Sequence, residues 1–201
     1  MTVQRLFPTL VYRGRLKQAG WRAFNNRLLQ ECQQLRLDDV GGQRWSAKNY
    51  PGGYTSYNSV NRMHQVSPTF AELQRRLHRH VRSFTSSLEF DLEQRELTMT
   101  DCWVNIMPRQ VVHSLHLHPL STISGTYYVK TPKGCAGLKF EDPRLDRFMA
   151  APPRTGDSRP WVVIPAEEGS LVLFESWLRH EVAPNPVTAE RISISFNYSW
   201  F

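Results

Sequence analysis

The sequence contains no long apolar run, and none of its stretches approaches the roughly 20 apolar residues that a membrane-spanning helix needs. Its first residues, MTVQRLFPTLVYRGRL, lack the basic start, apolar segment and small-residue cleavage site of a secretory signal. Cysteine is scarce too. Cys32, Cys102 and Cys135 are widely spaced without a CxxC pair, which argues against a disulfide framework or a cysteine-based zinc site. These absences predict a cytoplasmic protein with no membrane association.

Acidic residues are outnumbered, 18 against 25 Lys and Arg, so the formal net charge is +7. Four arginines, Arg75, Arg76, Arg79 and Arg82, fall within one predicted helix. A basic field of this kind attracts anions, nucleic acids included. Because such charge runs more often form a solvated helix face, we favour that interpretation and keep a nucleic-acid contact as the alternative.

Two N-terminal segments space their apolar residues by three and four, as amphipathic helices do. The first covers residues 17–37. The second covers residues 67–88, where Ser67 can cap the helix and Pro68 suits its first turn. Between them, GGQRWSAKNYPGGYTSYNSV (41–60) is rich in Gly, Asn and Ser and has no sustained period, so we predict a long loop or irregular strand.

The C-terminal half has a different character, with short β-rich runs separated by Pro, Gly and Asp turns. Closely spaced short strands favour an antiparallel sandwich or barrel. The predicted fold is therefore α+β and mainly β, a jelly roll of residues 97–201 buttressed by the two helices. A length of 201 residues suits one domain, in which residues 1–96 supply an N-terminal strand, helices and loop as support. The runs are LTMTDCWVNIM, SLHLH, ISGTYYVK, GLKFE, WVVIP, SLVLFES, HEVAP and ISISFNYSW.

Histidines gather in this β-rich half, three of them within HSLHLH. On a strand, positions i and i+2 share a face, so His116 and His118 can meet one metal ion. His113 would lie on the opposite face of a regular strand, which makes it the weakest candidate ligand. His180 follows an apolar strand and could supply a third ligand. Taken alone, an HxH pair is more often an ordinary strand feature than a metal site.

Eleven residues after His180 comes Arg191, in ERISISFNYSW. Arg191, Ser193 and Ser195 share one face of the predicted strand. A guanidinium offers a planar fork that matches a carboxylate, and a nearby hydroxyl can add a hydrogen bond. Arg191 with Ser193 could thus hold a carboxylate, whereas an outward-facing polar strand, with Arg191 paired to Glu190, is an equal alternative.

Several segments in the same order resemble one protein family: HSLHLHPLSTISGTYYVKTP, GLKFEDPR, EGSLVLFESWLRHEVAPN and ERISISFN. They are similar to a family of small bacterial and phage proteins, the 2-oxoglutarate- and Fe(II)-dependent oxygenases. More broadly, they resemble prolyl-hydroxylase-like oxygenases. The resemblance implies a double-stranded β-helix that uses Fe(II), 2-oxoglutarate and O2. It maps His116 and His180 onto two iron ligands and Arg191 onto the residue that binds 2-oxoglutarate, and the strand pattern adds His118 as the third ligand and Ser193 beside Arg191. The implied reaction is hydroxylation of a substrate with release of succinate and CO2.

The chain departs from the wider superfamily at His118, where an acidic residue is usual. Imidazole also suits iron, so a three-histidine site is chemically workable. It removes a negative charge from the metal's ligands. Glu141 is the alternative ligand, ranked lower because the neighbouring Pro143 usually ends a strand at a barrel rim.

Four further residues are pocket candidates implied by the resemblance. Tyr127 or Tyr128, on the strand after HxH, could contact the cosubstrate, and we take Tyr127 as the candidate; whichever of the two faces the outer layer would instead be packing. Asn105 and Asn197 could add polar groups.

Two other functions stay open: a cupin-like metal or small-anion sensor without turnover, and a three-histidine dioxygenase that needs no cosubstrate. The substrate would be a small molecule or a peptide, possibly of negative charge. Residues 41–66 and 142–160 would shape its pocket. The aromatic end, Tyr198, Trp200 and Phe201, leaves a homodimer open.

Overall fold

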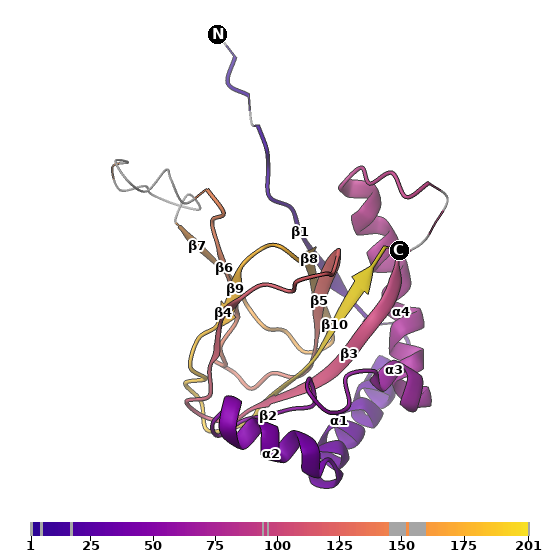
Figure 1. The fold of residues 1–201 in the computed structure, drawn as a ribbon, viewed down its shortest axis with the longest axis vertical. Coiled ribbons are helices and arrows are strands. Elements are labelled where there is room, and N and C mark those ends of the chain that lie inside the picture. Colours follow the sequence, from indigo (N-terminus) through magenta and orange to yellow (C-terminus); the bar gives the residue numbers. More distant parts are fainter. Residues whose placement is uncertain are drawn as a thin grey trace.

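A computed structural model describes residues 2–4, 6–16, 18–93, 95, 97–144, 152 and 160–200. Phe201 and most of residues 142–160, which we expected at an interface and at the pocket, lie outside the described residues. The described strands form two antiparallel sheets (Figure 1). The larger sheet has the order β1-β8-β5-β10-β3-β2 and the smaller one β4-β9-β6-β7. The larger contains β1 (Val11–Arg15), β2 (Tyr54–Thr55), β3 (Thr98–Met107), β5 (Ile123–Lys130), β8 (Ser170–Glu175) and β10 (Arg191–Ser199). The smaller contains β4 (His113–His116), β6 (Leu138–Glu141), β7 (Trp161–Ile164) and β9 (His180–Val182).

The two sheets enclose a core of apolar side chains from both. Tyr128 and Phe174 from the larger sheet pack in one cluster with Leu138, Phe140 and Val182 from the smaller. Every predicted β-rich run overlaps one of the observed strands, and β5 has the predicted bounds. The mainly β jelly-roll prediction is confirmed.

The opposite face of the larger sheet is covered by helices (Figure 1). These are α1 (Trp21–Asp38), α2 (Val40–Asn49), α3 (Met63–Val66) and α4 (Pro68–Ser87). Phe24 of α1 and Phe70 of α4 are buried in one cluster with Val104 and Ile194 of the sheet. The Ser67 hydroxyl accepts hydrogen bonds from the first amide groups of α4, as predicted. Both predicted helices are confirmed.

The prediction of a loop or irregular strand over residues 41–60 is wrong for its first part, because α2 occupies Val40–Asn49; the short strand β2 and turns follow. The Asp39 carboxylate caps this helix by accepting from the Gly42 amide at 2.8 Å. Ser46 Oγ then accepts from the Thr55 amide at 3.0 Å and ties α2 to β2. A cap and tertiary contacts thus hold a helix whose two glycines give it poor intrinsic propensity.

Part of the arginine run has a structural role. The Arg76 guanidinium lies 4.3 Å from the centroid of the Phe24 ring and pairs with Glu72 at 2.6 Å. Arg79 Nε donates to His80 Nε2 at 3.2 Å. These contacts within the chain favour the interpretation of the arginine run as an ordinary surface of α4 over a nucleic-acid contact.

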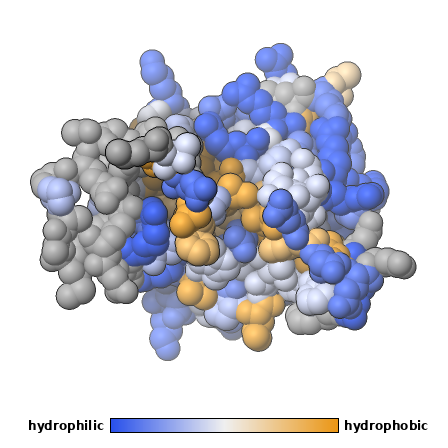
Figure 2. Space-filling view, turned by 90° about the horizontal axis from the view of Figure 1, so that it is seen from above, coloured by the Kyte–Doolittle hydropathy of each residue, from blue (hydrophilic) through white to orange (hydrophobic). Residues whose placement is uncertain are grey.

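No helix in the described part of the chain has the length and apolar content needed to span a bilayer. Seen from above, much of the surface is hydrophilic, and apolar residues gather near the middle of the face (Figure 2).

Candidate active site

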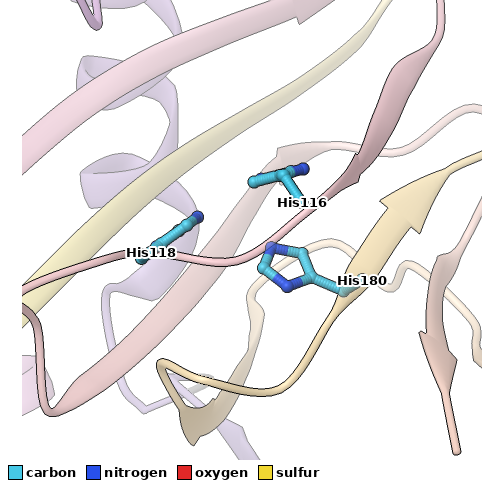
Figure 3. A group of neighbouring side chains, drawn as sticks. All are labelled: His116, His118 and His180. Carbon is cyan, nitrogen blue, oxygen red and sulfur yellow. The ribbon is translucent and has the colours of Figure 1, made fainter. Parts of the chain in front are cut away.

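Three histidines from β4, the segment after it and β9 lie close together (Figure 3). His116 ends β4 and lies directly opposite His180 of β9 in the antiparallel register. His118 follows β4, and its ring centroid lies 5.2 Å from that of His116 and 5.1 Å from that of His180. One nitrogen of each ring lies within 4.8 Å of the others. The predicted ligand set is therefore brought together from β4, its C-terminal extension and β9.

Each of the three rings has an acceptor at Nδ1. His116 Nδ1 lies 2.6 Å from the Ser114 carbonyl oxygen, and His180 Nδ1 lies 2.9 Å from that of Leu178. His118 Nδ1 lies 2.7 Å from Asn197 Oδ1. A carbonyl oxygen can only accept, so Nδ1 carries the proton in all three and Nε2 keeps its lone pair. This shared tautomer fits a site in which three Nε2 atoms hold one divalent ion.

Burial keeps these imidazoles neutral. Desolvation lowers the pKa of His180 to about 3 and that of His118 to about 4, and it also lowers the pKa of His116. A metal ion binds only the unprotonated ring, so the site needs to release no proton from these histidines at neutral pH. The donor set and its protonation state both suit a transition metal of the Fe(II) type.

His113 also reaches the cavity, contrary to the prediction that it faces the other way. The β4–β9 register shifts between His113 and His116, so the simple alternation of faces fails there. The His113 ring stacks on Tyr50 at 4.6 Å and lies 5.6 Å from His116. It is nevertheless outside the group of three whose nitrogens converge.

The side chain of Asn197 orients His118, a role the sequence did not reveal. Its amide oxygen lies 2.7 Å from His118 Nδ1 and accepts from the Ser124 hydroxyl at 2.9 Å. The Asn197 amide nitrogen approaches Asp101 Oδ2 at 3.5 Å, which fixes the amide's direction. The signal available in the sequence was that polar residues, Asn197 among them, alternate with apolar ones along strand β10.

We expect Asn197→Ala to weaken the binding of Mn(II), used as an Fe(II) substitute, by about 10- to 100-fold, the usual effect of losing a partner of a ligating histidine. Calorimetric titration of the full chain measures this. Ser195→Ala is the matched control on the same strand, because Ser195 Oγ accepts from Asn105 and does not contact a histidine. Equal affinities in both variants would contradict the orienting role.

Arg191 lies in the same cavity and is 2% exposed. Its Nη1 donates to Ser193 Oγ at 3.1 Å, while its buried Nε has no hydrogen-bond partner. Among the described residues no carboxylate pairs with it, and Glu190 instead pairs with Arg36 at 2.6 Å. The outward-facing alternative is therefore wrong. A buried guanidinium without a counter-charge is costly, and an anionic ligand would neutralise it.

Tyr128, and not Tyr127, belongs to this neighbourhood. Tyr127 faces the helices, where its hydroxyl donates to Asn25 Oδ1 at 2.8 Å, so its predicted contact with the cosubstrate is wrong. The Tyr128 ring centroid lies 5.1 Å from the Arg191 guanidinium carbon, and its buried hydroxyl has no partner. Two unsatisfied polar groups, the Tyr128 hydroxyl and Arg191 Nε, thus lie on the same side of the sheet.

Asn105 and Glu141 are the remaining candidates. Asn105 lines the cavity, as predicted, but its amide already donates to Ser195 and accepts from Thr55. Glu141 pairs with Arg179 at 3.0 Å and is not among the converging metal-ligand groups of the described residues. The three-histidine set is therefore the one that the geometry supports.

Residues 101–197, which include most of β3 and β10 and all three histidines, match a family model described as "Putative 2OG-Fe(II) oxygenase". Over these residues the chain is similar to the 2OG-Fe(II) oxygenases. Enzymes of this family are oxidoreductases that use Fe(II), 2-oxoglutarate and O2. A comparison with curated protein sequences found no match.

Solved structures show the same fold at low identity. A prolyl-4-hydroxylase from Pseudomonas putida is 15% identical, with a TM-score of 0.58 over 96% of this chain and 94% of that one. HygX from Streptomyces hygroscopicus, solved with nickel, 2-oxoglutarate and hygromycin B, is 13% identical, with a TM-score of 0.63 over 95% and 83%. An oxidoreductase of the 2OG-Fe(II) oxygenase family from Burkholderia pseudomallei is 20% identical, with a TM-score of 0.50. The match covers 67% of this chain and 58% of that protein.

Proposed function

We propose that this protein is a 2OG-Fe(II) oxygenase that hydroxylates a small-molecule substrate and releases succinate and CO2. The observation that carries the proposal is the pairing, in one cavity, of three converging neutral histidines with a buried arginine that has no carboxylate partner. The histidines suit a metal ion, and the arginine suits an anion beside it.

In this proposal His116, His118 and His180 hold Fe(II) through their Nε2 atoms. Bound iron supplies the activation of O2 that side chains cannot provide. Three neutral imidazoles leave the ion's charge uncompensated, so a dianionic cosubstrate is favoured more strongly than at a site with a carboxylate ligand.

Arg191 would hold the far carboxylate of 2-oxoglutarate. Its guanidinium offers a bidentate fork, and the partnerless Tyr128 hydroxyl can donate a further hydrogen bond to the same carboxylate. Ser193 Oγ, which accepts from Arg191 Nη1, keeps the fork in place.

The cavity between the histidines and Arg191 is narrow, about 50 Å³. A volume of that size holds a few waters at most, so a five-carbon diacid must displace lining side chains as it binds. Trp103 and Phe174 are among the residues that line it.

The three-histidine set also keeps one alternative open, a dioxygenase that needs no cosubstrate, because such a site requires no anion pocket. The unpaired Arg191 favours the 2-oxoglutarate-dependent reaction over it. Two similar structures, one solved with hygromycin B and one with a nogalamycin compound, support a small-molecule substrate.

Anaerobic loading with Fe(II) followed by 2-oxoglutarate tests the proposal. We expect a weak visible charge-transfer band, because the keto acid would chelate the ion. Glutarate is the matched control, since it has both carboxylates but lacks the keto group, and it should give no band. Metal-loaded, folded protein that gives no band with 2-oxoglutarate would overturn the proposed function.

A further inference from the structure

A second cavity, of about 310 Å³, adjoins the first one at the histidines. His113, His116, His118 and Trp103 line both cavities. The first cavity extends from these rings toward Arg191, whereas the second extends toward α2 and the segment after β2. The candidate metal site formed by the histidines thus lies between two compartments whose lining residues differ.

Aromatic side chains dominate the second compartment. Trp45 of α2, Tyr50, Tyr57 and Trp103 all line it. Tyr50 and Trp103 are 4% and 5% exposed and form a fixed inner wall. Tyr57 is 48% exposed, and its ring meets that of Trp103 edge to face at a centroid distance of 5.1 Å. Such rings offer flat apolar surfaces on which a ligand ring can stack.

Charge separates the two compartments further. Among the described residues that line the second cavity there is no Asp, Glu, Lys or Arg. Besides its histidines, tyrosines and tryptophans, its polar side chains are neutral ones, the amides of Asn49 and Asn197 and the hydroxyls of Thr55 and Ser114. Once the dianionic 2-oxoglutarate has neutralised the proposed ion, a charged ligand there would lose hydration without gaining a counter-charge, which is costly. Of the two cavities, the Arg191 compartment alone has a cationic side chain among the described lining residues.

We propose that the second cavity is the substrate compartment and that it takes an uncharged small molecule containing a flat ring and hydroxyl groups. This rests on the proposed function, which assigns the Arg191 compartment to 2-oxoglutarate. A volume of about 310 Å³ lies at the lower end of the range for small-molecule sites, about 300–1,000 Å³, which favours a compact ligand over a large one. The ring stacks against Trp45 and Tyr57, and the reacting carbon faces the histidines.

Three probes of matched shape distinguish the charge classes: 4-hydroxybenzyl alcohol, 4-hydroxybenzoate and 4-hydroxybenzylamine. Dissociation constants are measured by ligand-observed NMR on the full chain. We expect the neutral alcohol to bind at least tenfold more tightly than either charged probe. Tightest binding of the benzoate, retained in Arg191→Ala, would overturn the proposal, because the anion would then be using this cavity.

Substitutions of residues that line the second cavity test whether the neutral probe binds there. Trp45→Ala and Tyr57→Ala should each weaken binding of the alcohol at least tenfold, and Tyr57→Phe should restore it, because the ring is kept. Trp177→Ala is the matched control, since Trp177 is 46% exposed but does not line the cavity. Unchanged binding in both alanine variants would overturn the assignment.

The charge-transfer band with 2-oxoglutarate separates the two proposals. A band in wild type together with no preference for the neutral probe would refute the substrate class alone. Selective ring binding without a band would refute the oxygenase reaction and leave the aromatic compartment as a ligand site.

Discussion

Replacing Arg191 with Ala should raise the dissociation constant for 2-oxoglutarate by about 100-fold while leaving metal affinity nearly unchanged. The guanidinium is buried and meets no carboxylate in the described chain, so it is available to pair with the ligand. Removing one partner of a buried, hydrogen-bonded charge pair costs about 2–5 kcal/mol, and each factor of ten in affinity corresponds to about 1.4 kcal/mol. Titration of 2-oxoglutarate into the Fe(II)-loaded, oxygen-free protein measures the change.

Arg191→Lys is the informative companion. Lysine keeps the positive charge but loses the planar fork, so we expect an affinity between those of wild type and the alanine variant. An alanine variant that binds 2-oxoglutarate within about threefold of wild type would show that the anion lies elsewhere.

The second large effect is expected at His180. Replacing His180 with Ala should reduce the affinity for Mn(II) by roughly 100-fold or more, because losing a ligand should exceed the 10- to 100-fold cost of losing its supporting partner. His180 pairs across the sheet with His116, and its ring is the one packed most closely against that ligand, with 4.3 Å between centroids. Anaerobic calorimetry on the full chain gives the affinity.

His113→Ala provides the control, because His113 lines the same cavity but stays outside the converging group. Its affinity for Mn(II) should remain within about threefold of wild type. Similar losses in the His113 and His180 variants would mean that the ion is held by a different set of rings.

The sequence predicts the strands of the jelly roll well, because short apolar runs between Pro, Gly and Asp turns are a local signal. It also predicts the ligand pair at His116 and His118 from the two-residue period of a strand. His113 could not be placed, because a register shift is set by pairing with β9 and leaves no mark in the strand itself.

The choice between Tyr127 and Tyr128 failed for another reason. Strand β5 is buried on both faces, by the helices on one side and the second sheet on the other, so both tyrosines are fully buried. Without alternation of polar and apolar residues, no pattern in the sequence tells which face meets Arg191. Helix α2 was missed because a cap at Asp39 and contacts with β2 outweigh its weak propensity.

Strand β4 lies at the edge of the smaller sheet, and its pairing with β9 is interrupted between His113 and His116. An ion held by His116 and His180 would join these two strands at the paired position next to the interruption. Binding to the folded state alone adds about 2.7 kcal/mol at an ion concentration 100 times the dissociation constant. Cofactor supply would therefore govern how often this edge of the barrel opens, and amide hydrogen exchange in β4 would slow as the metal concentration rises.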